Sequence, residues 1–183
     1  MKLKIYQTKR GLVHDETFED LDDWEVKNPS CATTNNNQLT LTHCDKDTYI
    51  IRPFDESVGI VEYDIDYTPQ KEGDAGGVLL YNSSDHHVEV LEVADKGKPD
   101  LGKARIKRTP HEDGHIIVVE MEREGRWELI DTFTGDYRYY GVISKKGESS
   151  FEPVVVDRIT AVKENYLTVE GLPFGFSASL EGV

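Results

Sequence analysis

The chain has 183 residues, of which 37% are hydrophobic and 31% charged, a composition typical of a globular domain rather than of a disordered or membrane-spanning chain. Its formal net charge of -14 disfavours nucleic acid as a partner, because an acidic surface repels phosphate backbones. No window is apolar over the length that a bilayer requires, so no membrane span is predicted.

Short apolar or alternating runs follow one another along the chain, separated by Gly, Asp and Asn turns. Turn residues recur about every 8–12 residues, which is typical of a β-sandwich or barrel. We therefore expect an all-β fold, with a single short helix candidate from Glu16 to Trp24. The expected strands span 3–7, 39–43, 49–52, 59–67, 78–81, 88–93, 104–107, 116–122, 127–131, 139–144, 154–161 and 167–169.

The two cysteines, Cys31 and Cys44, are expected to lie apart. If residues 24–30 and 38–44 are the two arms of a hairpin, Cys31 lies near its loop and Cys44 at its far end. At about 3.3 Å per residue the two thiols are then about 20 Å apart. A disulfide requires Cα atoms within about 7 Å, so no disulfide is predicted. The N-terminal segment MKLKIYQTKR lacks the apolar core of a signal peptide.

Three acidic residues alternate along the strand expected at 59–67. The period of a strand places Glu62, Asp64 and Asp66 on one face, with neighbouring carboxylates about 7 Å apart. Glycoside hydrolysis uses such a pair, and crowding raises the pKa of one member, which suits a general acid. These residues are the catalytic candidates if the protein is an enzyme. The alternative interpretation is a solvated outer face.

An aromatic group near residue 130 is the candidate ligand-binding site. Sugars pack their C–H faces on aromatic rings, and their hydroxyls bind charged or amide groups. The alternative for these rings is packing in the core. The predicted ligand-binding residues are Trp127, Tyr137, Tyr139, Tyr140 and Arg138.

Oxygen-bearing turn residues are a candidate calcium site. Asp74, Asn82 and Asp85 lie in neighbouring loops and could supply the hard oxygen ligands that calcium prefers. The alternative interpretation is ordinary turn chemistry. His87 and Glu89 share a strand face, but no third ligand lies nearby in the sequence, so no metal site is predicted there.

The tail has a different pattern from the rest. The piece LTVEGLPFGFSASL reads as a strand, a Gly-Leu-Pro turn and a second strand, and it resembles the opening hairpin of an immunoglobulin-like module. A lone hairpin is marginally stable in water. We expect residues 1–162 to form one domain. Residues 163–183 then form a C-terminal hairpin that docks on it, pairs with another chain, or begins a further β module.

Three stretches in order resemble the concanavalin A-like lectin/glucanase superfamily. They are ETFEDLDDWEV, then GDAGGVLLY, then GRWELIDTF followed by YYGVIS and FEPVVVDRI, and the resemblance covers roughly residues 14–162. It implies a jelly-roll sandwich of two antiparallel sheets. Glucanases of this superfamily carry a Glu-x-Asp-x-Glu strand, and this chain has Asp66 in place of the last Glu.

The leading functional hypothesis is a non-enzymatic carbohydrate-binding or adhesion module in a larger surface, virion or secreted protein. The superfamily resemblance favours an extracellular or cell-surface location and a polysaccharide partner. The alternative is a glycoside hydrolase or lyase that uses the paired carboxylates. A third hypothesis is a scaffold whose tail hairpin joins a neighbour by strand addition.

Overall fold

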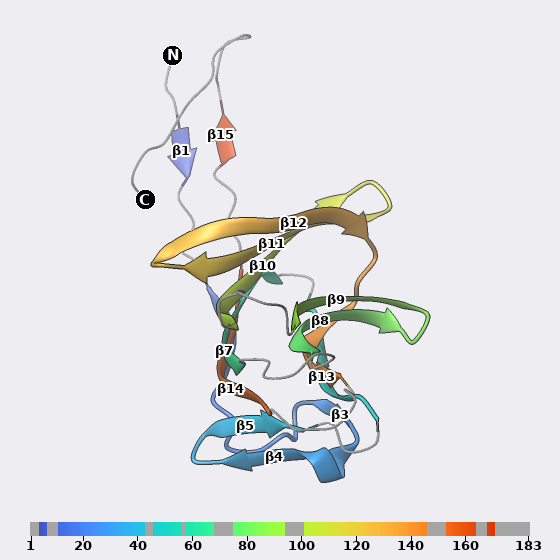
Figure 1. The fold of residues 1–183 in the computed structure, drawn as a ribbon. Coiled ribbons are helices and arrows are strands. Elements are labelled where there is room, and N and C mark those ends of the chain that lie inside the picture. Colours follow the sequence, from blue (N-terminus) through green and yellow to red (C-terminus); the bar gives the residue numbers. More distant parts are fainter. Residues whose placement is uncertain are drawn as a thin grey trace.

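The chain folds almost entirely into β-strands in a computed structural model that describes residues 4–6, 11–42, 46–55, 58–67, 75–93, 101–145, 153–163 and 168–170. Two antiparallel sheets pack face to face, which confirms the predicted all-β sandwich (Figure 1). The helical element of the described residues is one short 3-10 turn, η1 (Pro29–Cys31).

The larger sheet has eight strands in the order β12-β11-β10-β7-β14-β5-β4, with β2 also paired to β14. It bends around the smaller sheet, so its outer face is convex (Figure 1). Its strands are β2 (Leu12–Glu16), β4 (Ala32–Asn35), β5 (Gln38–Leu41), β7 (Val58–Tyr67), β10 (Leu101–His111), β11 (Gly114–Arg123), β12 (Arg126–Gly135) and β14 (Val154–Lys163).

The smaller sheet has five strands in the order β3-β6-β13-β8-β9. Its strands are β3 (Glu25–Lys27), β6 (Thr48–Pro53), β8 (Ala75–Ser83), β9 (His86–Val93) and β13 (Tyr139–Lys145).

Alternation along the strands produces the core between the sheets. On β7, the side chains of Val61, Tyr63 and Ile65 point inward and are buried, whereas Glu62 and Asp64 point outward. Inward residues of the smaller sheet meet them from the other side. These include Ile50, Val78, Leu80, Tyr140 and Val142.

The edge strand β12 contains a bulge. Val119 of β11 pairs with Asp131, and the next residue, Glu120, pairs with Leu129. Ile130 is therefore the extra residue and interrupts the ladder.

The predicted helix from Glu16 to Trp24 is wrong. Glu16 ends β2, and its buried carboxylate accepts hydrogen bonds from the backbone N–H of Phe18 at 2.6 Å and from the indole N–H of Trp24 at 2.8 Å. Phe18 has a φ of 56°, in the left-handed region. Hydrogen bonds from a side chain to nearby donors replace a helix here, and they direct both aromatic rings into the core.

The expectation of no disulfide is also wrong. Asn36 and Asn37 form the turn of the β4–β5 hairpin with φ values of 51° and 59°, as a two-residue type I′ turn requires. Cys31 consequently lies at the open end of the hairpin, where its carbonyl accepts a 2.9 Å hydrogen bond from the N–H of Thr42. Cys31 is disulfide-bonded. The chain holds one other cysteine, Cys44, which lies outside the described residues.

A separate two-stranded ladder joins the two ends of the described chain. Strand β1 (Lys4–Tyr6) pairs antiparallel with β15 (Thr168–Glu170). The Gly-Leu-Pro turn and second strand expected in the tail lie outside the described residues.

Candidate functional site

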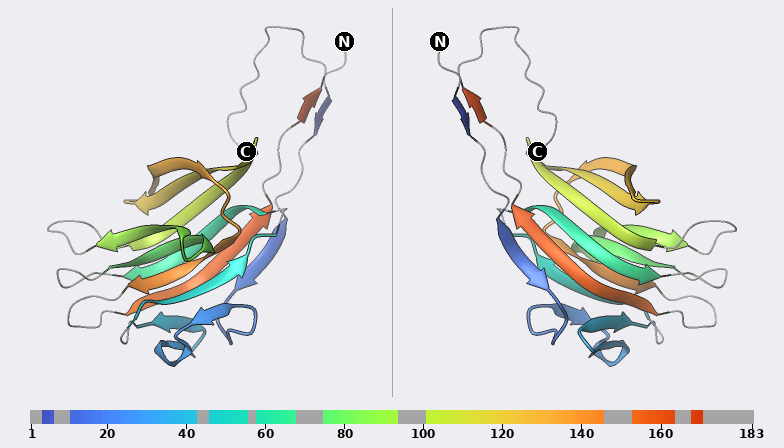
Figure 2. Two further views of the ribbon diagram at one scale, coloured as in Figure 1. Left: turned by 90° about the vertical axis from the view of Figure 1, so that its right-hand side faces the viewer. Right: turned by 90° about the vertical axis from the view of Figure 1, so that its left-hand side faces the viewer.

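The outer face of the larger sheet, whose strands can be followed by colour in Figure 2 (right), carries two rows of polar and aromatic side chains. The rows follow from the pairing of β14, β7, β10, β11 and β12, because residues opposite one another on neighbouring strands share a face. One row is Arg158, Asp64, Lys103, Glu122 and Trp127, and the next is Thr160, Glu62, Arg105, Glu120 and Leu129.

A hollow of about 240 Å³ opens between these rows. We call it the outer hollow. It brings together Glu62, Asp64 and Trp127, which the sequence predicted in two separate sites. The residues that line it are Glu62, Tyr63, Asp64, Lys103, Glu122, Trp127, Arg158 and Thr160.

Arg105 holds Trp127 in place at one end of the outer hollow. Its guanidinium lies 4.2 Å from the centroid of the indole ring, in cation–π contact. The same guanidinium forms an ion pair with Glu120, which also lies 3.3 Å from Nζ of Lys107. The hydrogen bond from Arg105 is the main cause that lowers the pKa of Glu120. The ring is therefore ordered by charges that lie outside the hollow.

Arg158, which lines the outer hollow, also forms an ion pair. Arg158 donates two hydrogen bonds, of 2.7 and 2.6 Å, to the carboxylate of Asp15 on β2. These bonds are the main cause that lowers the pKa of Asp15. Within the described part of the chain, Glu62, Asp64 and Glu122 form no ion pair, although Lys103 lines the same hollow.

The catalytic candidates lie on the convex side of the sheet. Alternate residues of a strand lie about 7 Å apart, so Glu62 and Asp64 are spaced more widely than the pair of a retaining glycosidase and about as far apart as that of an inverting one. The backbone of Asp66 pairs with Val155, but its side chain lies outside the described part. Trp127 lies on β12, four strands away in the sheet from Arg158 on β14. Because Trp127 and Asp64 are far apart in the sequence, no local sequence pattern could predict that they line one hollow.

The predicted aromatic group is divided by the fold. Tyr137 and Tyr140 are 6% and 1% exposed and pack in the core, which was the alternative stated for these rings. Their burial follows from position: Tyr140 takes the inward face of β13, and Tyr137 stacks on His86 with ring centroids 4.9 Å apart. Arg138 is exposed and pairs with Asp136 at 3.0 Å.

Tyr139 takes the outward face of β13, where it joins two tyrosines that the sequence did not single out. Its ring centroid lies 6.2 Å from that of Tyr81, which lies 5.7 Å from that of Tyr49. We call these three residues the tyrosine shelf. It lies on the smaller sheet, on the opposite side of the sandwich from the outer hollow.

The calcium candidates lie only partly within the described residues. Asn82 lies on β8 and Asp85 in the turn to β9, while Asp74 lies outside the described part. Across the described ranges, no three His, Cys, Asp or Glu side chains come close enough together to hold a metal ion. His87 and Glu89 are neighbours, with Nε2 and Oε1 3.3 Å apart. Lys145 binds the same carboxylate at 2.8 Å, and an ammonium at that place opposes a metal ion.

No family model matches the chain, and no curated protein sequence matches it. Among solved structures, a GH43B protein of the Bacteroides ovatus xyloglucan PUL is similar, with a TM-score of 0.63 and 13% identity, over 80% of this chain and 38% of that one. The GH43 protein BlXynB of Bacillus licheniformis gives a TM-score of 0.63 and 13% identity, over 82% and 39%. The exoplasmic/lumenal domain of VIP36, in a Ca²⁺-bound form, gives a TM-score of 0.52 and 10% identity, over 84% of this chain and 91% of that one.

These likenesses show a concanavalin-like β-sandwich, as the sequence resemblance implied. The chain spans about two fifths of the length of each GH43 chain. Within the described ranges, no helix has the length and apolar character needed to cross a bilayer.

Proposed function

Starting from a concanavalin-like sandwich with an aromatic ring set among polar side chains, we propose that this protein is a non-enzymatic carbohydrate-binding module. The outer hollow carries the proposal. Trp127 offers a ring face for the C–H face of a sugar, while the carboxylates of Glu62 and Asp64 and the hydroxyl of Thr160 bind its hydroxyls. Ligand sites generally combine apolar surface with a few placed polar groups in this way.

The structural neighbours support this ligand class. The VIP36 domain was also solved in a form bound to Ca²⁺ and mannose, with a TM-score of 0.52 to this chain. We propose a polysaccharide as the partner, in the context of a larger surface, virion or secreted protein. An extracellular or lumenal location is supported by the disulfide-bonded Cys31, because such bonds persist in oxidising compartments. The tail, residues 163–183, is proposed as the start of a further module.

Replacing Trp127 tests the proposal. We expect Trp127→Ala to weaken binding of xyloglucan, xylan or mannan by roughly tenfold, because an aromatic contact contributes about 0.5–1.5 kcal/mol beyond area burial. Affinity gel electrophoresis and calorimetry measure the loss. Tryptophan fluorescence gives a direct readout, because the only other tryptophan of the chain, Trp24, is 7% exposed.

Ile130→Ala is the matched control, since Ile130 lies on the same strand, is 40% exposed and does not line the hollow. Equal affinity of Trp127→Ala and the unaltered protein would contradict the assignment of the hollow. Absence of binding to the whole panel would contradict the function itself. Repeating the titration with a chelator tests the further proposal that calcium is held by Asp74, Asn82 and Asp85.

A glycoside hydrolase or lyase is the second candidate. One observation favours it: Glu62 and Asp64 line the same hollow and have no ion-pair partner among the described side chains. Release of reducing ends by the unaltered protein, abolished in Glu62→Gln, would support this alternative. An inactive protein that still binds the polysaccharide would exclude it.

A further inference from the structure

We propose that the tyrosine shelf is a second binding surface, for an uncharged polysaccharide chain, on the side of the sandwich opposite the outer hollow. The inference extends the proposed carbohydrate binding and rests on it. It assigns a ligand to a face for which no sequence motif was singled out apart from Tyr139.

Strand pairing places the aromatic rings in the middle of the outer face. Tyr139 of β13 pairs with Tyr81 of β8, which pairs with His87 of β9. Tyr49 of β6 pairs with Ile143 of β13, so it lies diagonally across from Tyr81. The position between these two tyrosines on β13 is Gly141.

Gly141 is required by the close approach of the β6 backbone to β13. A Cβ at this position would lie 1.8 Å from the carbonyl oxygen of Ile50, so no other residue fits. The rings of Tyr49 and Tyr81 lie 5.7 Å apart, with an angle of 35° between their planes. Burial, followed by the hydrogen bond to Tyr81, raises the pKa of Tyr49 to about 12.

Aliphatic side chains beneath the rings keep the shelf rigid. Ile51, Leu79 and Ile143 point to the outer face, yet they are 2%, 1% and 2% exposed, and the three tyrosines pack against them. Because the packed rings have little rotamer freedom, they lose little conformational entropy when a ligand stacks on them. The rings themselves are half-buried and keep part of their surface in solvent.

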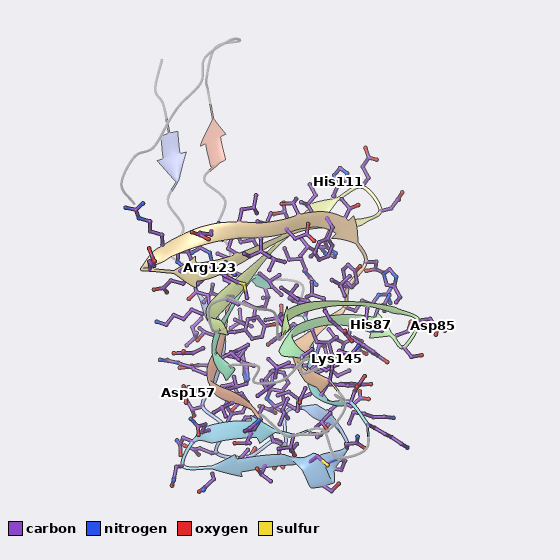
Figure 3. The ribbon with its side chains drawn as sticks, in the orientation of Figure 1. Asp85, His87, His111, Arg123, Lys145 and Asp157 are labelled. Atoms are coloured by element: carbon purple, nitrogen blue, oxygen red, sulfur yellow. The ribbon has the colours of Figure 1, made fainter. Side chains whose placement is uncertain are left out.

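The rim of the shelf is polar, with an ion pair on one side and the carboxylates of Glu25 and Asp47 near Tyr49 on the other. Glu89 accepts hydrogen bonds of 3.1 and 2.8 Å from Lys145, and its Oε1 lies 3.3 Å from Nε2 of His87. Figure 3 labels Lys145 and His87. The His87 ring continues the row, with its centroid 6.3 Å from that of Tyr81 and a 31° angle between the rings.

An uncharged sugar polymer fits this arrangement best. In a chain of net charge -14, with the carboxylates of Glu25 and Asp47 near Tyr49, an anionic ligand is repelled from the shelf. The rings of Tyr49 and His87 are inclined by 35° and 31° to that of Tyr81, so these three present successive stacking surfaces. Tyr139 stands edge-on to Tyr81, at 73°, and closes the row on one side. The Tyr hydroxyls and Glu89 can bind sugar hydroxyls at its border.

The experiment titrates the full chain with neutral hexasaccharides of cellulose, xylan and mannan, and follows both calorimetric stoichiometry and tyrosine difference absorbance. We expect two sites in the unaltered protein and one in Trp127→Ala. Tyr81→Ala should lose the remaining site, with an affinity change of roughly tenfold or more. Tyr81→Phe, which keeps the ring, should retain the site.

His87→Ala provides a second variant if Tyr81→Ala fails to fold, because His87 is exposed and covers none of the buried aliphatics. It should weaken the shelf site without changing the thermal midpoint. Unaltered binding in both shelf variants, with loss only in Trp127→Ala, would overturn the inference and leave the outer hollow as the binding site. Loss of binding only in the shelf variants would instead contradict the assignment of the outer hollow as a binding site. Concentration-dependent dimerisation that Tyr81→Ala abolishes would overturn the inference in favour of a protein interface.

Discussion

At the scale of single residues, Arg105 determines how the outer hollow is presented. It contacts Trp127 with its planar face and Glu120 with its N–H groups, so one side chain orders the indole and satisfies a carboxylate. A lysine could not replace it, because an ammonium cannot stack and donate in the same geometry.

The Glu120 ion pair should make stability depend on pH in acid. The pKa of Glu120 in the folded protein lies below its ordinary value of 4.5, chiefly because of the Arg105 hydrogen bond. The pair therefore stabilises the fold above about pH 4.5 and loses this contribution as the pH falls through the lowered pKa. We expect Glu120→Gln to reduce the unfolding free energy at neutral pH by roughly 1–2 kcal/mol, with a smaller deficit in strong acid.

Urea denaturation at neutral and acid pH measures this difference. Glu112→Gln is the matched control, since Glu112 is exposed in the β10–β11 turn. A deficit that stays constant across the pH range would contradict the ion-pair explanation.

At the scale of elements, the turn of the β4–β5 hairpin determines where the disulfide-bonded Cys31 lies. Two asparagines with positive φ set a two-residue loop, and this loop places Cys31 at the open end of the hairpin. The Asn35–Asn37 run was the available signal: a turn at Asn36–Asn37, rather than arms at 24–30 and 38–44, places Cys31 opposite Thr42.

The disulfide leads to a quantitative expectation. We expect the unreduced protein to show no free thiol after unfolding, and reduction to lower the unfolding free energy by about 2–4 kcal/mol. A thiol titration in denaturant and urea melts with and without reductant measure both effects. Cys31→Ser should be insensitive to reductant. Two reactive thiols in the unreduced protein would contradict the bond.

The sequence predicted the strands well and their partners poorly. Alternation in β7 correctly separated the buried Val61 and Tyr63 from the outward Glu62 and Asp64. The neighbourhood of Trp127 depends on the register of β7, β10, β11 and β12, which is set by contacts far apart in the chain. For the same reason, the shelf could not be recognised from Tyr49 and Tyr81, which are 32 residues apart (81 - 49).

At the scale of the whole molecule, the two outer faces differ in electrostatic character. The outer hollow is lined by three carboxylates and two cations, whereas the tyrosine shelf consists of uncharged rings with the Glu89–Lys145 ion pair on its rim, and the chain as a whole carries a net charge of -14. Anionic polymers should be repelled by the hollow and unattracted by the shelf.

We therefore expect no binding of heparin or polygalacturonate, even at low ionic strength. Affinity for a neutral polysaccharide should change by less than about twofold between roughly 0.05 and 0.5 M salt, because screening acts on charged ligands. Affinity electrophoresis over this range checks both statements. Tight, salt-sensitive binding of an anionic polymer would show that neither face was identified correctly.

The bulge in β12 affects the tendency of this edge strand to pair with strands of other molecules. Leu129 and Ile130, at 65% and 40% exposed, make this edge strand apolar, and an apolar edge invites addition of strands from other molecules. The extra residue is Ile130 itself, so the bulge interrupts the regular spacing of backbone donors and acceptors at the most apolar part of the edge. The exposed charges of Arg126, Glu128 and Asp131 border the same stretch. We therefore expect the bulge and these charges to oppose fibril-like growth at this edge.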